Sequence, residues 1–516
     1  MPTVRDTLTY QPSELKFGTS GLRGLVTEMT DLECYINTAG FLKFLAGIGH
    51  LQAGGTVYVA GDLRDSTPRI TRAVNQAITD GGYSVAYMGL LPTPALAFYG
   101  LQQKAANIMV TGSHIPADRN GIKFYKADGE VLKADEVGIK EAVAAVRSDL
   151  YGQDSDSAAF DAQGMLKVAA ELPAIDNAAR DLYLRRYTTV FDGSTFAGKK
   201  IVFYQHSAVG RDLLVQMLQQ LGAEVVPVGR SDVFVPIDSE NVTPKDQAYF
   251  KQLSKEYPDA FAIVSTDGDS DRPFVIDEHG VFHRGDELGA IVAHWLKADA
   301  AAYPVSANDA VDSYLNNNGV EWTHTKIGSP YVVVAMQEEA AKGKQRVVGW
   351  EVNGGFLLGA DIEVNGKTLG ALPTRDAILP IIIALRMAVD AGSAVSEVFA
   401  ALPQRFTGAG LIDNFPTTIS QKIVAQYSSD NETTHGALGQ FFTAEHGFGQ
   451  VDKIDALDGV RIFFDNGEIA HLRPSGNAPQ LRIYSVADTQ GRADQIVALA
   501  IAEPDGIFRQ IEKALS

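Results

Sequence analysis

The sequence predicts a mixed α/β fold made of several domains. Three segments share one layout, in which an apolar strand is followed by a polar loop containing glycine, at Ser113, Asp267 and Glu351. Open α/β sheets bind their ligands at the carboxyl ends of strands, where this layout puts polar side chains. A chain of 516 residues with 45% hydrophobic content can form three or four domains. The layout indicates divergent repetition of one α/β domain.

Shifts in composition predict the domain boundaries. Residues 149–162 are rich in Asp, Ser and Ala and poor in large apolar residues, which is typical of a connection. We predict domains over residues 1–160, 161–283, 284–397 and 398–516. Within them we expect a strand over 199–204 and helices over 211–221, 285–297 and 378–389, with Pro380 in the first turn of the last helix.

The first loop contains Ser113 and His114. It follows the apolar run 106–110, and the His-Ile-Pro sequence cannot continue a regular element, so Ser113 is expected at the carboxyl end of a strand. An Asn-Gly pair and Lys123 come after the loop. A serine beside a histidine is also common in ordinary capped turns, so this motif by itself leaves a structural role open.

The second loop carries Asp267, Asp269 and Asp271 after the apolar run 260–264. Three carboxylates at alternate positions supply the oxygen ligands that Mg²⁺ prefers. A calcium loop of the EF-hand type is excluded, because Arg272 stands at the sixth position, where that loop has glycine. Arg272 also places a positive charge beside the predicted metal, and a solvated acidic turn has little need of that charge.

Two further loops are suited to a phosphosugar. Residues 473–479 (RPSGNAP) form a turn in which Arg473 and the backbone amides could bind phosphate, and Arg482 lies in the strand that follows. The loop after the run 347–350 offers Glu351 and Asn353 to sugar hydroxyls. Ordinary turns remain the alternative for both loops. A hairpin with an Asn-Gly turn is the better interpretation of residues 363–366.

Together these loops resemble the α-D-phosphohexomutase superfamily, whose four hallmark loops occur here in the same order along essentially the whole chain. The N-terminal segment 17–24 (FGTSGLRG) also matches the opening of that family. The resemblance implies four domains, three similar mixed α/β domains and a smaller C-terminal α+β domain, around a central cleft. It implies an enzyme that interconverts hexose 1-phosphate and hexose 6-phosphate through a phosphoserine and a hexose 1,6-bisphosphate, which also serves as activator.

The resemblance also assigns roles to residues. Ser113 would carry the phosphoryl group and, with the three aspartates, bind Mg²⁺. Lys123 would act as general acid/base, with His114 beside the nucleophile and Arg23 and Arg272 near the transferring phosphate. The residues implied in substrate binding are Lys326, Glu351, Asn353, Arg473, Ser475, Gly476, Asn477 and Arg482.

The sugar loop departs from the family pattern. Asn353, Gly354 and Gly355 stand where serine, glycine and histidine are usual, so a ligand to sugar or phosphate is missing. We therefore expect a phosphomannomutase or phosphoglucomutase rather than a phosphoglucosamine mutase. A Mg²⁺-dependent sugar phosphatase and a non-catalytic sugar-phosphate binding protein are the rivals from other classes. Asp62-Leu63-Arg64 resembles a turn of the first domain of the family, and a helix N-cap is as good an interpretation of it as a catalytic role.

Charge and composition limit the partners. The balance of 44 basic and 63 acidic residues gives a net charge of −19, which argues against nucleic acid or an anionic membrane as partner. A phosphosugar is anionic as well, so its site must be a local positive pocket. Cys34 is the single cysteine, which excludes an intrachain disulfide and fits the cytoplasm. No secretory or membrane segment and no obligate protein partner are expected.

Overall fold

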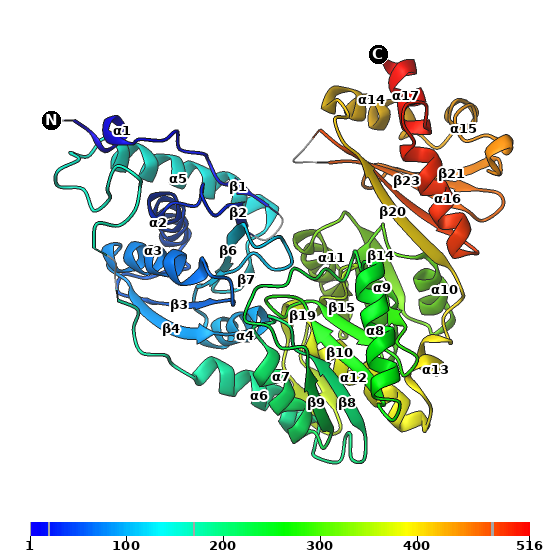
Figure 1. Cartoon of the computed structure of the whole chain (residues 1–516), viewed down its shortest axis with the longest axis horizontal. Helices are drawn as coiled ribbons and strands as arrows, with labels where there is room; N and C mark the ends of the chain where they lie inside the picture. The colour runs from blue at the N-terminus through cyan, green and yellow to red at the C-terminus, as the bar shows by residue number, and fades with distance from the viewer. Residues whose placement is uncertain (1, 19–20, 169–170, 476–478) are drawn as a thin grey trace. The chain divides into compact units, whose positions relative to one another are not determined.

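The computed structural model describes residues 2–18, 21–168, 171–475 and 479–516. The chain divides into two compact units, residues 1–301 with 328–399 and residues 302–327 with 400–516 (Figure 1). Strand β13 (Ala300–Pro304) is where the chain passes from the first unit to the second. The three boundaries expected between the four domains stay a prediction. Among the described residues, no helix has both the length and the apolar character needed to cross a membrane.

The first sheet carries the Ser113 loop. Its strand order is β1-β2-β6-β5-β3-β4, with β7 paired to β6. The strands are β1 (Lys16–Phe17), β2 (Gly21–Leu25), β3 (Thr56–Gly61), β4 (Ser84–Leu90), β5 (Asn107–Val110), β6 (Arg119–Lys126) and β7 (Gly129–Glu130). The helices of this region are α1 (Val4–Thr7), α2 (Asp31–Gly47), α3 (Thr67–Asp80), α4 (Thr93–Gln103) and α5 (Glu136–Tyr151). All four residues of β5 are buried, and the Ser113 loop begins directly after this strand.

The second sheet repeats part of the first. Its order is β12-β11-β10-β8-β9, with β8 (Lys200–Tyr204), β9 (Glu224–Val228), β10 (Ala262–Thr266), β11 (Pro273–Ile276) and β12 (Phe282–His283). Strand β10 is parallel to β8, β8 is parallel to β9, and β10 is antiparallel to β11. In the first sheet β5, β3, β4 and β6 have the same relations. The predicted similarity of these domains is therefore confirmed, and the Ser113 and Asp267 loops occupy equivalent positions.

Helices α6 (Ala178–Val190), α7 (Arg211–Gln220) and α8 (Pro244–Glu256) accompany the second sheet. Helix α8 begins at a capping box, in which Thr243 and Asp246 exchange hydrogen bonds with each other's backbone amides. The strand expected over 199–204 and the helix expected over 211–221 are both present, each within one residue at either end.

The third α/β region carries the Glu351 loop. Strand β15 (Val347–Trp350) is antiparallel to β16 (Phe356–Leu358), which is antiparallel to β19 (Leu372–Asp376). The predicted hairpin is formed by β17 (Ile362–Val364) and β18 (Lys367–Leu369). The helices of this region in the first unit are α9 (Gly285–Trp295), α11 (Ser329–Ala341), α12 (Ile378–Ala391) and α13 (Val395–Phe399). Pro380 lies in the first turn of α12, as predicted.

The second unit contains α10 (Asp309–Asn317), β14 (Glu321–Thr325) and an antiparallel sheet of order β20-β24-β23-β22-β21. The strands of this sheet are β20 (Phe406–Ile412), β21 (Val451–Asp455), β22 (Val460–Phe464), β23 (Ile469–Pro474) and β24 (Leu481–Ala487). Its helices are α14 (Thr417–Tyr427), α15 (Glu432–Gly439), α16 (Gln490–Ile501) and α17 (Ile507–Leu515). This is the predicted α+β domain.

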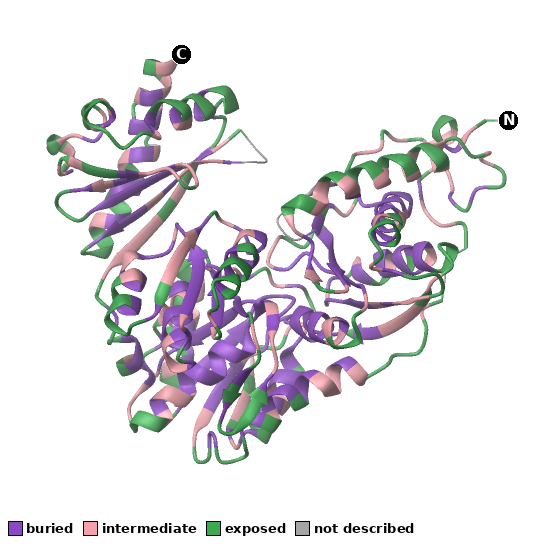
Figure 2. Ribbon diagram, turned by 180° about the vertical axis from the view of Figure 1, so that it is seen from behind, coloured by how far each residue is buried: buried purple, intermediate pink, exposed green. Residues whose placement is uncertain are grey.

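Buried residues concentrate in the strands and on the inner faces of the helices (Figure 2). In the first domain Phe41 stacks on Phe124, with ring centroids 4.4 Å apart. In the second unit Phe442, Phe448 and Phe464 form an aromatic group under the sheet. The first sheet and the sheet of the second unit thus each pack on a core of their own.

His471 on β23 makes the second unit sensitive to acid. Its side chain is buried, Nε2 donates to the carbonyl of Asp458 at 2.6 Å, and burial lowers its pKa to about 4. The unfolded chain takes up a proton near pH 6.5 and the folded chain does not, so the free energy of unfolding falls as the pH drops through this range. We expect His471 to account for about 2 kcal/mol of loss between pH 7 and pH 5. Urea unfolding at both pH values checks this, because His471→Gln should reduce the pH dependence by that amount.

Candidate active site

Ser113 lies just beyond β5 and is almost fully buried. Its Oγ donates to Asp267 Oδ2 at 2.6 Å, and His114 Nδ1 is 3.3 Å from the same Oγ. The backbone of Ser113 has φ 54°, a left-handed conformation that costs free energy for any residue except glycine. The structure therefore brings together the serine of the first loop and an aspartate of the second, 154 positions apart in sequence.

Asp267, Asp269 and Asp271 form one buried carboxylate group, with an oxygen of each within 4.8 Å of the others. Burial and the two neighbouring carboxylates raise the pKa of Asp267 well above its usual range. Asp269 Oδ1 and Asp271 Oδ1 are buried and have no hydrogen-bond partner among the described residues. Buried acceptors without a donor are rare, and a hard cation would satisfy both. The group could therefore hold a metal ion.

Three cationic side chains surround these carboxylates. Lys123 Nζ donates to Asp269 Oδ2 and Asp271 Oδ2, both at 2.6 Å. Arg375 Nε donates to Asp271 Oδ2 at 3.0 Å, and Arg272 Nε lies 3.9 Å from Asp271 Oδ1. Burial by itself lowers the pKa of Lys123, but the two aspartates raise it above its ordinary value. Lys123 is therefore an ammonium ion in this geometry.

The Glu351 loop reaches the same centre through Arg375, whose guanidinium donates to Glu351 Oε2 at 2.7 Å. Gly355 permits this contact, because a Cβ there would lie 2.6 Å from the Arg375 side chain. Asn353 is buried, and its amide donates to Glu240 at 2.9 Å and accepts from the Gly355 backbone. Its side chain thus fixes the loop rather than extending from it.

Asp238 and Glu240 belong to the site and were missed from the sequence. Asp238 accepts from Arg272 at 3.1 Å and lies 3.8 Å from His114 Nε2, and Glu240 lies 3.7 Å from Arg272. Burial, with the charges of Arg272 and Arg23, lowers the pKa of His114, which leaves its imidazole neutral. Arg23, on β2, is exposed. Asp238 and Glu240 follow no strand and match no motif, so no sequence signal marked them.

Asp62 and Arg64 also contact the Ser113 loop, which the sequence did not predict. The N-cap of α3 is Ser66, so Asp62 is not the cap that the sequence suggested. Asp62 Oδ2 accepts from Thr111 Oγ1 at 2.7 Å and from the Gly112 amide at 3.3 Å. Asp62 and Arg64 are both buried. Only the fold shows this, since 49 positions separate Asp62 from Thr111 in sequence.

The other predicted site residues lie in the second unit. Arg473 and Arg482 are directly opposed on β23 and β24, an arrangement of like charges that is unfavourable without an anion. Arg473 donates to Asp458 at 3.0 Å, while the buried Arg482 Nε has no hydrogen-bond partner among the described residues. Asp458 also accepts from the Ile327 amide, which places the exposed Lys326 next to this group.

Ser475 is buried, and its amide donates to Gln480 at 3.0 Å. Gly476 and Asn477 lie outside the described residues. The described part of the predicted phosphate loop therefore contains Arg473 and Ser475, and Arg482 lies beside Arg473 on the neighbouring strand.

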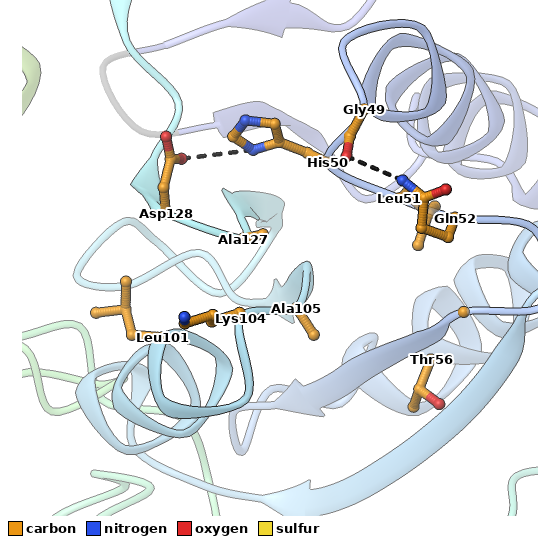
Figure 3. A pocket seen from close by; sticks show the side chains of 11 residues that line it. Gly49, His50, Leu51, Gln52, Thr56, Leu101, Lys104, Ala105, Ala127 and Asp128 are labelled. Carbon is orange, nitrogen blue, oxygen red and sulfur yellow. Dashed lines mark hydrogen bonds and ion pairs between the residues drawn. The ribbon is translucent and has the colours of Figure 1, made fainter.

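A separate pocket of about 700 Å³ lies at the opposite end of the first sheet, beside the start of β3 (Figure 3). Thr56, Leu101 and Ala105 help to line it. His50 and Asp128 also line it and form an ion pair at 3.6 Å. None of the predicted site residues lines this pocket, so it is distinct from the Ser113 site.

Arg375 links the three-carboxylate group to the Glu351 loop, so its loss should destabilise the first unit. Arg375→Met leaves Asp271 and Glu351 buried without this cation, and we expect the free energy of unfolding to fall by about 3–5 kcal/mol. Urea unfolding measures this. Arg386→Met is the control, because Arg386 pairs with the exposed Asp390 and should matter by less than about 1 kcal/mol. Equal losses in the two variants would contradict the role of Arg375.

Comparison with known proteins identifies the family. Four models of the phosphoglucomutase/phosphomannomutase family match the chain: α/β/α domain I at residues 14–149, domain II at 181–280, domain III at 284–406 and the C-terminal domain at 421–503. A phosphomannomutase of Sinorhizobium fredii is 42% identical over 488 residues, covering 94% of this chain and 98% of the relative. A phosphomannomutase of Salmonella muenchen is 40% identical and covers 95% of each chain.

More distant proteins share the fold. A probable phosphoglucosamine mutase of Methanothermobacter thermautotrophicus is 26% identical, covering 93% of this chain and 95% of the relative. The crystal structure of a phosphoglucomutase/phosphomannomutase family protein from Burkholderia thailandensis superposes with a TM-score of 0.72 at 18% identity, covering 98% of each chain. The predicted four-domain architecture and hexose phosphate mutase are thereby confirmed. The chain belongs to the phosphoglucomutase/phosphomannomutase family.

Proposed function

We propose that this protein is a phosphomannomutase in which Ser113 carries the phosphoryl group between the 1- and 6-positions of the sugar. The single observation that carries the proposal is the buried contact of Ser113 Oγ with the three-carboxylate group, at 2.6 Å from Asp267. A buried hydroxyl needs one acceptor, and a single carboxylate would serve; folding does not require a group of three carboxylates there. A phosphoryl carrier needs a cation site beside its Oγ, because charge develops on the phosphoryl oxygens during transfer.

Asp267, Asp269 and Asp271, with an oxygen of phospho-Ser113, would hold Mg²⁺, which the unpartnered Oδ1 atoms of Asp269 and Asp271 fit. When bound, Mg²⁺ would neutralise charge on the phosphoryl oxygens. Arg272 and Arg23 supply further positive charge near Ser113, since both influence the neighbouring His114 electrostatically.

The proposed step transfers the phosphoryl group from Ser113 to a sugar hydroxyl. The free hydroxyl of a hexose monophosphate attacks phosphorus, a new O–P bond forms, and the bond from phosphorus to Ser113 Oγ breaks. The proton of that hydroxyl passes to a base, and the reverse step, from the other end of the hexose 1,6-bisphosphate, returns it. We assign this exchange to Lys123. Its ammonium form, present here beside unphosphorylated Ser113, gives a proton to the sugar oxygen that leaves when the bisphosphate phosphorylates Ser113, and the neutral amine so formed takes the proton of the hydroxyl that attacks phospho-Ser113. Ser113 Oγ passes its own proton to Asp267, to which it donates, and regains it when its bond to phosphorus breaks.

The remaining residues bind the substrate. Glu351, held by Arg375, is proposed to accept from sugar hydroxyls, and Asn353 to shape that loop from within. Arg473, Arg482 and Lys326 in the second unit, with Ser475, Gly476 and Asn477, are proposed to bind the phosphate that is not transferred. The opposed arginines support this assignment, because an anion would relieve their repulsion.

Mannose is the sugar we favour. The two relatives that are 40% and 42% identical are phosphomannomutases, whereas the phosphoglucosamine mutase is 26% identical. Mannose and glucose differ only at the 2-hydroxyl, and one hydrogen bond to a buried partner is worth about 1–3 kcal/mol. Turnover of glucose phosphate at a lower rate is therefore compatible with the proposal.

The decisive test follows the 1-phosphates of mannose, glucose and glucosamine by phosphorus NMR, with Mg²⁺ and catalytic hexose 1,6-bisphosphate. We expect mannose 6-phosphate to form fastest, and Ser113→Ala to abolish turnover because it removes the phosphoryl acceptor. Ser157→Ala, at an exposed serine, is the control and should turn over normally. Release of inorganic phosphate without a 6-phosphate would favour the phosphatase instead. Turnover by Ser113→Ala would overturn the role of Ser113.

The proposed metal site can be tested by a binding measurement, without an activity assay. Asp269→Asn removes one charge from the carboxylate group, and we expect the affinity for Mg²⁺ to fall at least about tenfold. Calorimetric titration of the unphosphorylated protein with Mg²⁺ measures this. Asp212→Asn is the matched control, because Asp212 pairs with Arg230 at the surface. Unchanged affinity in Asp269→Asn would exclude the group as the site of the ion.

A further inference from the structure

Every N–H donor of the Arg64 guanidinium forms a hydrogen bond, either with a backbone carbonyl of residues 113–119 or with Asp62. Arginine carries five such donors in a rigid planar fork. Nε donates to Asp62 at 3.3 Å. One terminal nitrogen donates to the carbonyl oxygens of Pro116 at 2.7 Å and Arg119 at 2.8 Å, and the other to those of Ser113 at 2.9 Å and Ile115 at 2.6 Å. The side chain is 2% exposed.

These contacts satisfy carbonyl groups that the sheet cannot. Strand β5 ends at Val110 and β6 begins at Arg119, so the intervening loop leaves the hydrogen-bond ladder. Carbonyls that leave the ladder need other donors where they are shielded from water. Arg64 donates to those of Ser113, Ile115 and Pro116 in this loop and to that of Arg119 at the start of β6. One is the carbonyl of Ser113 itself, the residue held in the left-handed conformation at φ 54°. Arg64 thus binds the backbone of the loop at the residue that adopts the left-handed conformation.

The other side of the guanidinium is closed by the second domain. The Phe234 ring stacks on it, with the Arg64 Cζ atom 3.8 Å from the ring centroid. Gly268, between two of the metal-site aspartates, approaches so closely that a Cβ there would lie 2.6 Å from the Ser113 carbonyl oxygen and 2.9 Å from Phe234. The carbonyl that Arg64 binds is therefore also the point where the metal loop meets the serine loop.

We propose that Arg64 is a positioning residue for phosphoryl transfer, which fixes the backbone of residues 113–119 so that Ser113 Oγ faces the carboxylate group. Arg64 acts through Ser113, to whose carbonyl it donates. The inference rests on the proposed role of Ser113 as phosphoryl carrier. Lysine cannot replace Arg64, because three donors on one nitrogen cannot reach four carbonyls and a carboxylate.

The test compares Arg64→Lys with the unaltered protein in two measurements. Hydrogen exchange of the amides of residues 112–119 reports loop order without any substrate. Single-turnover phosphorylation of Ser113 by hexose 1,6-bisphosphate, followed by intact-protein mass, reports positioning. We expect faster exchange in this loop and a phosphorylation rate about 100-fold lower. The KM for the sugar phosphate should change less than about threefold, since Arg64 is not a substrate contact.

Arg147→Lys is the matched control. Arg147 is a partly buried arginine of the same domain that donates to Glu33 at 2.7 and 2.8 Å and does not touch the Ser113 loop. Its replacement should lower stability while leaving phosphorylation unchanged. The positioning role is wrong if Ser113 in Arg64→Lys is phosphorylated at the normal rate. It is also wrong if the phosphorylation rate falls no further in Arg64→Lys than in Arg147→Lys. If the unaltered protein is never phosphorylated, the proposed role of Ser113 is wrong, and this result is distinguishable from failure of the Arg64 proposal alone.

A milder variant covers the case in which Arg64→Lys does not fold. Phe234→Leu removes the stacked ring and leaves all five hydrogen bonds of Arg64 in place. We expect a phosphorylation rate about three- to tenfold lower, with faster exchange confined to the Ser113 loop. An unchanged rate together with unchanged exchange would overturn the proposal.

Discussion

Three buried carboxylates held within 4.8 Å of one another are the constraint on which the rest of the first unit depends. Their mutual repulsion, in a place with little water to screen it, has to be balanced by cations. Lys123 comes from the first sheet, Arg272 from the metal loop and Arg375 from the end of β19. Because each of three α/β regions supplies one of these charges, the electrostatic balance of the site and the packing of the regions depend on each other.

The repeated topology explains how three different loops meet there. In the first two sheets, and again between β15 and β16, the loop that leaves a central strand returns along an antiparallel neighbour. One backbone plan therefore brings Ser113, the three aspartates and Glu351 to one centre. Positions with close backbone approach, such as Gly268 and Gly355, let these loops touch where a side chain would separate them.

The net charge of the whole chain is negative, whereas cationic side chains gather at two places in it. A net charge of −19 would repel a phosphosugar, yet Lys123, Arg272 and Arg375 gather at one centre, and Arg473 and Arg482 oppose each other at another. Much of the positive charge at the first centre is balanced by aspartates. At the second centre Arg473, Arg482 and Lys326 outnumber Asp458, so the positive charge available to a phosphate is local.

The sequence by itself determined the α/β class, the repeated layout and the loops at Ser113, Asp267, Glu351 and Arg473, because each depends on local periodicity and on motifs of adjacent residues. Tertiary structure alone decided which distant residues meet. Asp238, Glu240 and Arg375 joined the site without a local signal, Asn353 turned inward, and Arg64 proved to hold the Ser113 loop from 49 positions away. Such contacts could not be read from the chain, since they depend on how sheets and loops pack, which no short stretch of sequence encodes.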